Sequence, residues 1–124
     1  MKMINTKNAP AAVGAYSQGV MADNTLYVSG QLPFDPNTMD IPSNDIEALT
    51  TQALNNIQAI VEAAGLKKEN IVRCGIFLKD MNDFPKMNEA YADFFKSHKP
   101  ARAAVEVARL PKDVRIEIDA IAVK

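Results

Sequence analysis

The sequence predicts an α+β fold in which two helices pack on one β-sheet. Residues 44–64 carry apolar side chains at steps of three and four, which is the period of a helix that buries one face. Residues 115–123 instead alternate polar and apolar side chains, which is the period of a strand. The elements run strand, strand, helix, strand, helix, strand, strand, so each helix serves as a crossover on the same sheet.

The N-terminal third predicts a hairpin followed by a loop. Residues 15–20 and 26–29 form the two strands, separated by a turn at Asp23 and Asn24. Residues 32–42 contain three prolines and therefore predict a loop before the first helix.

Both helices carry recognisable end signals. Asn44 followed by Glu47 resembles a capping pair for the first helix, and Gly65 is typical of a helix end. After a strand at residues 71–78, Asp83 is the predicted N-cap of the second helix, with Pro85 tolerated in its first turn. The apolar stripe that this second helix would bury consists of Met87, Ala90, Tyr91 and Phe94.

The last two strands carry the side chains of greatest chemical interest. Pro100 opens the strand that holds Arg102, because proline cannot donate to a sheet ladder. A turn at residues 110–113 leads into the final strand, where Glu117 lies on the polar face. A short turn between two strands could bring Arg102 near Glu117, although on residue types alone an ordinary exposed ion pair is the simpler explanation.

One face of the sheet has no predicted helix to cover it. That face must meet water or another subunit. The apolar strand residues that favour pairing are Val105, Val107, Ile121 and Val123. We therefore expect an oligomer.

Length and composition predict one soluble domain at residues 1–124. A chain of 124 residues is long enough to bury a core. The net charge of −1 gives no reason to expect a nucleic-acid or membrane partner. The single cysteine, Cys74, excludes an internal disulfide and suits a reducing compartment. Because no apolar run approaches the roughly 20 residues of a membrane span, and no signal-peptide pattern opens the chain, we expect a cytoplasmic protein.

The sequence offers few catalytic groups. The glycines form no phosphate loop, and His98 and Cys74 alone cannot supply a zinc site. An arginine, a few carboxylates and backbone amides near Gly30 remain. Arginine suits a carboxylate, and a glutamate can activate water or donate a proton. This set suits a small carboxylic acid with an electrophilic centre, of which an imine is one example.

Five blocks of sequence span nearly the whole chain: residues 14–18, 28–33, 62–66, 88–95 and 100–118. Each block alone is weak, but five in register are specific. Together they resemble the RidA/YjgF family of reactive intermediate deaminases, also known as endoribonuclease L-PSP.

The resemblance implies a fold, an assembly and an activity. The fold would be chorismate-mutase-like, with a single mixed sheet of about six strands and two helices packed on one face. The assembly would be a homotrimer with clefts between subunits. The activity would be that of a 2-iminobutanoate/2-iminopropanoate deaminase, a hydrolase that needs no metal or cofactor. It would convert reactive enamines and imines, including 2-aminoacrylate from pyridoxal-phosphate enzymes, to 2-keto acids and ammonia.

The resemblance also implies roles for particular residues. Arg102 would hold the substrate carboxylate, and Glu117 would hold the attacking water and relay its proton. Backbone groups at Gly30 and Ala104 would contact the ligand. The other residues expected at or near the cleft are Tyr16, Ser29, Phe84 and Asn88.

Two positions depart from the family pattern. Ala104 stands where cysteine is common, and Ala15 stands where proline is common. A contact through the backbone N–H of Ala104 would survive the first change, whereas a required thiol would not. The second change could loosen the loop slightly.

Two other functions fit parts of the same sequence. A regulatory module that binds 2-keto acids would need Arg102 but not Glu117. A ribonuclease or translation inhibitor is disfavoured by the acidic balance and by the lack of a stripe of basic and aromatic residues.

Overall fold

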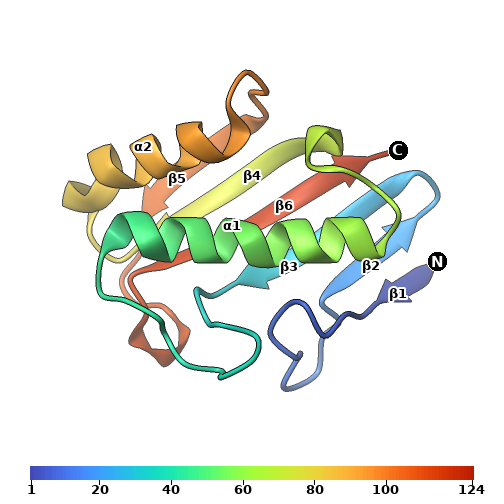
Figure 1. The fold of residues 1–124 in the computed structure, drawn as a ribbon, viewed down its shortest axis with the longest axis horizontal. Coiled ribbons are helices and arrows are strands. Elements are labelled where there is room, and N and C mark those ends of the chain that lie inside the picture. Colours follow the sequence, from blue (N-terminus) through green and yellow to red (C-terminus); the bar gives the residue numbers. More distant parts are fainter.

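The computed structural model describes residues 1–124 and contains one mixed sheet with two α-helices on one of its faces (Figure 1). The helices are α1 (Ile46–Ala63) and α2 (Phe84–Phe95). The strands are β1 (Lys2–Ile4), β2 (Gly19–Ala22), β3 (Thr25–Gln31), β4 (Ile71–Leu78), β5 (Ala101–Glu106) and β6 (Ile116–Val123). Their order across the sheet is β1-β2-β3-β6-β4-β5, and only β4 and β5 run parallel. The predicted α+β class is confirmed.

The core lies between the helices and the sheet. Strand β6 is central, and its inward-facing residues are those that the alternating pattern predicted: Ile116, Ile118, Ala120 and Ala122. Helix α1 packs its apolar stripe against them, including the fully buried Leu54, Ile57 and Ile60. One layer of helices is enough to cover one face of the sheet, and the other face stays open.

The N-terminal hairpin is confirmed, but its first strand is shorter than predicted. Strand β2 begins at Gly19 rather than at Ala15, because residues 15–18 still belong to the irregular segment between β1 and β2, in which Gly14 has a φ of +124° that suits glycine. Strand β1 was not predicted; it pairs with β2 through Ile4 and Gly19. Three residues are too few to show a strand period.

The first helix ends as predicted but begins differently. Gly65, with a φ of +82°, follows its C-cap. The predicted pairing of Asn44 with Glu47 is wrong: Asp45 is the N-cap, and no side chain caps the helix. The carbonyl of Asn44 instead accepts a hydrogen bond from Arg115.

The second helix also follows the prediction with one correction. Asp83 occupies the N-cap position and Pro85 lies in the first turn, although the Asp83 carboxylate does not cap the helix. Phe95, rather than Phe94, completes the buried stripe, and Phe94 packs against the core only partly buried. Phe94 and Phe95 follow Tyr91 by three and four residues, and both steps fit one helix face. The stripe alone therefore could not show which of the two is buried.

The face of the sheet without helices exposes apolar side chains. Tyr27, Val105 and Val123 are among the exposed large hydrophobic residues of the chain. No helix combines the length and apolar character needed to cross a membrane.

Candidate active site

Arg102 lies on β5 at the edge of the sheet, beside helix α2. In the parallel ladder it is the register partner of Cys74, which is buried, so its side chain leaves on the helix-covered face. Its Nη1 donates to Oδ1 of Asn88 at 2.8 Å. Its guanidinium carbon lies 4.8 Å from the ring centre of Tyr91 and 5.4 Å from that of Phe84. One face of α2 therefore holds the guanidinium of Arg102. The remaining N–H groups of the guanidinium are available to a ligand.

Tyr91 is a site neighbour that the sequence analysis assigned only to the core. It is buried, and its hydroxyl has no hydrogen-bond partner. Burial and the nearby Cys74 raise the pKa of Tyr91, so its hydroxyl stays neutral. Its spacing from Phe84 and Asn88, seven and three residues, is a sequence signal that could have placed it beside Arg102.

Ala104 lies two residues beyond Arg102 and shares its face of β5. Its register partner is the buried Ile76, and its methyl group packs against the core. We call the group formed by Phe84, Asn88, Tyr91, Arg102 and Ala104 the Arg102 side.

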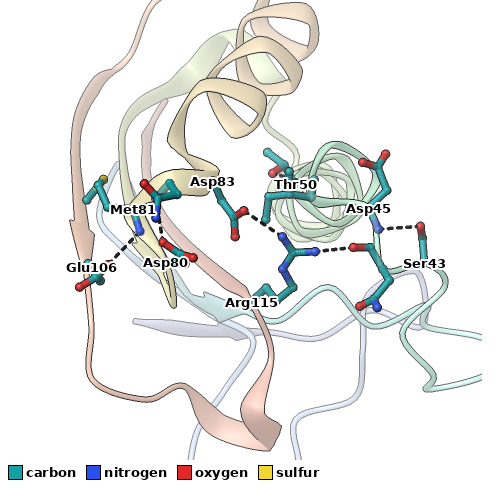
Figure 2. Close-up of polar contacts among 11 residues, drawn as sticks. Ser43, Asp45, Thr50, Asp80, Met81, Asp83, Glu106 and Arg115 are labelled. Carbon is teal, nitrogen blue, oxygen red and sulfur yellow. Dashed lines mark hydrogen bonds and ion pairs between the residues drawn. The ribbon is translucent and has the colours of Figure 1, made fainter.

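The start of α2 is tied to two strands (Figure 2). Arg115, just before β6, donates through Nη2 to Oδ1 of Asp83 at 2.9 Å and through Nη1 to the carbonyl of Asn44. The backbone N–H of Met81 donates to Oε1 of Glu106, at the end of β5, at 2.9 Å. These contacts fix the first turn of α2, which carries Phe84 and leads to Asn88.

Glu117 lies on the other face of the sheet, over Gly30. The β3–β6 register is irregular between Val28 and Gln31, and this irregularity brings the backbone of Gly30 under the carboxylate. A β-carbon at position 30 would collide with Oε2 and Cδ of Glu117. Glycine at this position therefore allows the Glu117 carboxylate to lie against the backbone, and a larger residue would displace it.

The environment of Glu117 changes its acidity. Partial burial, and secondly the negative charge of Asp119, raise the pKa of Glu117 above its ordinary value. A carboxylate with a raised pKa is a stronger base than an exposed one, and its acid form persists to higher pH.

A cleft of about 650 Å³ opens beside Glu117 and contains four of the predicted site residues. Its full lining is Pro10, Ala11, Val13, Tyr16, Ser29, Gly30, Gln31, Leu32, Phe34, Met39, Pro111, Lys112 and Glu117. We call this cleft and its lining the Glu117 side. Most of the cleft walls were not predicted, because they come from loops, which carry no periodic signal.

The Ser29 hydroxyl is engaged within the chain. It donates to the carbonyl of Ser17 at 2.5 Å, and the Ser29 backbone N–H donates to the carbonyl of Gln18 at 2.9 Å. Both bonds fix the segment that presents Tyr16.

A single chain does not bring Arg102 and Glu117 together, so the proximity that a short turn could have produced does not occur within one chain. Strand β4 lies between β5 and β6. Across β4, Arg102 is level with Cys74 and Glu117 with Phe77, three residues further on. Side chains three residues apart on a strand point to opposite faces, so the two groups lie on opposite sides of the sheet.

The chain matches known proteins over almost its full length. The family model described as endoribonuclease L-PSP matches residues 6–124. A curated Escherichia coli protein named 2-iminobutanoate/2-iminopropanoate deaminase is 54% identical over 126 residues, which cover 99% of this chain and 98% of that protein.

Solved structures agree with the fold. The YjgF gene product of E. coli has a TM-score of 0.96 and 54% identity, with 100% of this chain and 99% of that chain covered. E. coli TdcF with bound serine has a TM-score of 0.96 and 46% identity, with 100% and 99% covered. Sequence blocks, six-stranded sheet and full-length matches thus lead to one conclusion: the chain belongs to the RidA/YjgF family, whose model carries the description endoribonuclease L-PSP.

Proposed function

We propose that this protein is a 2-iminobutanoate/2-iminopropanoate deaminase, which hydrolyses small 2-imino acids and their enamine forms to 2-keto acids and ammonia. The observation that carries the proposal is Glu117, a half-buried carboxyl group with a raised pKa that lies over Gly30 in an open cleft. The 54% identity to an E. coli protein of that name supports the same assignment. Residues 1–124 would act as one domain in the cytoplasm.

The active site would be completed by a second copy of the chain. Arg102 and Glu117 lie on opposite faces of one sheet, so one substrate can meet both only if they come from different copies. The exposed apolar residues on the helix-free face supply a surface for such contact. We infer a homotrimer in which the Arg102 side of one subunit faces the Glu117 side of its neighbour.

The Arg102 side would bind and orient the substrate. The guanidinium would hold the substrate carboxylate through paired hydrogen bonds, while Asn88 and the rings of Tyr91 and Phe84 keep it in place. Because only a backbone contact is assigned to Ala104, a methyl group at that position leaves the contact intact. Backbone groups at Gly30, with Ser29 and Tyr16 nearby, would contact the other end of the ligand.

The Glu117 side would move the protons. Glu117 takes a proton from a water as the water oxygen bonds to the carbon of the protonated imine. The resulting carbinolamine receives this proton on its nitrogen. The carbon–nitrogen bond then breaks, and the hydroxyl proton passes to the Glu117 carboxylate, which gives the 2-keto acid. Glu117 transfers this proton to the released ammonia, which leaves as ammonium. One water is consumed, and the reaction as written needs no cofactor.

The proposal is tested with 2-iminopropanoate generated by an amino-acid oxidase and trapped with semicarbazide. Wild-type protein should lower the amount of trapped imine. Arg102→Ala should lose more than about 100-fold in kcat/KM, because the carboxylate loses its charged, orienting contact. Arg109→Ala is the matched control, since this exposed arginine pairs only with the exposed Asp113.

Two results would count against the deaminase. Full activity in Arg102→Ala would remove the proposed carboxylate clamp. An inactive, folded wild type that still binds a 2-keto acid would favour a binding module instead. The description of the family model also keeps RNA cleavage as a second candidate, which would be supported by cleavage that weakens steeply with added salt.

A further inference from the structure

Gln18 ends the first family block but touches no part of the proposed chemistry. Its side chain is only 1% exposed, and its amide is fully engaged. Its Oε1 accepts from the backbone N–H of Thr6 at 2.7 Å. Its Nε2 donates to the carbonyls of Pro10 at 2.8 Å and Thr6 at 3.1 Å, with the carbonyl of Ala9 at 3.3 Å.

These bonds organise a segment that has no strand partner. Residues 5–18 run between β1 and β2 without entering the sheet. The buried amide of Gln18 therefore satisfies backbone groups of this segment, as ladder hydrogen bonds satisfy those of a strand. The same segment supplies one wall of the cleft, through Pro10, Val13 and Tyr16.

Asn56 holds the other loop wall in the same manner. It lies on α1 and is 1% exposed. Its Nδ2 donates to the carbonyls of Phe34 at 2.9 Å and Leu32 at 3.1 Å, and both residues line the cleft. Its Oδ1 accepts from Nε2 of Gln52 at 3.0 Å, which fixes the orientation of the amide.

We propose that Gln18 and Asn56 are positioning residues that fix the two loop walls of the cleft and thereby set the affinity for the imino acid, without touching it. The inference rests on the proposed function for the identity of the ligand. Neither amide lines the cleft. Each contacts its loop only through backbone groups, so its loss should move the walls and leave Glu117 and Gly30 in place.

The test compares Gln18→Met and Asn56→Leu with Thr50→Val. Met and Leu keep the approximate size of the side chains but remove their hydrogen bonds. Thr50 is the matched control, because its buried hydroxyl donates to the carbonyl of Ile46 within α1 and does not line the cleft. For each folded variant, KM and kcat are measured for 2-iminopropanoate, and Kd is measured for 2-ketobutanoate by calorimetry.

We expect KM and Kd to rise about tenfold in Gln18→Met and Asn56→Leu, because displaced walls fit the ligand less well, while kcat changes little. Thr50→Val should lower the melting temperature but leave all three constants near wild type. Unchanged KM and Kd in both cleft variants, or an equal change in Thr50→Val, would overturn the proposal. If one of these two variants does not fold, the KM and Kd of the other still test whether its own amide positions the wall that it holds.

The proposed function can fail separately. Wild-type protein that binds 2-ketobutanoate but hydrolyses no imine would remove the deaminase assignment alone. The Kd values of the variants would still decide whether the two amides position the walls.

Discussion

The Arg102 side and the Glu117 side differ in how the fold holds them. Arg102 is exposed on an edge strand and is held by one amide and two aromatic rings of a single helix. Glu117 is half-buried on the central strand, and its carboxylate lies so close to the backbone of Gly30 that a β-carbon there would displace it. An exposed cation keeps donors free for a ligand, whereas burial of a carboxyl changes its acidity. This difference fits the proposed division of work, with binding at Arg102 and proton transfer at Glu117.

The largest expected difference between the two sides is in kcat. Glu117→Gln should lower kcat at least about 100-fold, because the amide cannot accept the water proton. Binding of 2-ketobutanoate should change much less, since Arg102 remains. Glu62→Gln is the control, an exposed carboxylate that accepts only from Gln58 on α1. A Glu117→Gln protein with near-normal kcat would show that Glu117 does not transfer the proton.

A smaller effect on kcat should distinguish substitutions at the two glycines that lie under carboxylates. In Gly30→Ala the new methyl group collides with Glu117, and in Gly75→Ala it collides with Asp119. Both should lose about 2 kcal/mol of stability, a typical cost of overpacking. Only Gly30→Ala should also lower kcat, because it displaces the proton-transfer group. Equal kcat values in the two folded variants would contradict the role given to Gly30.

The pH dependence should change when the neighbouring charge is removed. Burial first, and then Asp119, raise the pKa of Glu117. Asp119→Asn should therefore move the acid limb of the kcat/KM profile to lower pH, while Asp113→Asn should leave it in place. A limb that stays fixed in Asp119→Asn would show that another group controls it.

The same raised pKa has a consequence for stability. The folded chain holds the Glu117 proton more tightly than the unfolded chain. This contribution therefore favours the folded state at pH values below the unfolded pKa of the group, and it is lost as the pH rises through the folded pKa. The contribution should shrink in Asp119→Asn when melting is followed across that range.

The smallest effect is expected from thiol reagents. Burial raises the pKa of Cys74 to about 11, and position 104 carries no thiol. Iodoacetamide should leave both the native mass and the activity unchanged, and it should modify Cys74 only after unfolding. Rapid loss of activity in the native state would show that the Arg102 side depends on a cysteine.

The sequence predicted the elements whose side chains repeat regularly. The helical stripe of α1 and the alternation of β6 were both correct, because burial of one face imposes their period. The order of strands was not accessible in this way. The insertion of β4 between β5 and β6 depends on crossover packing, and it is what separates Arg102 from Glu117.

The candidate site was predictable where residue type limits the chemistry. Arg102, Glu117 and Gly30 could be named because few groups in this chain suit an imino acid and because they match a family pattern. Most of the cleft walls, and the amides of Gln18 and Asn56, were not predicted. Their roles arise from contacts between segments 8 to 24 residues apart, which no local pattern records.

The central claim, that one active site uses Arg102 and Glu117 from different copies, is best tested by mixing two inactive variants. Arg102→Ala and Glu117→Gln proteins are unfolded together and refolded at equal concentration, and mixed oligomers are verified by native mass spectrometry. Random assembly should restore up to about a quarter of wild-type activity, because one cleft in four would receive both intact residues. Verified mixed oligomers without imine hydrolysis would contradict a site shared between subunits.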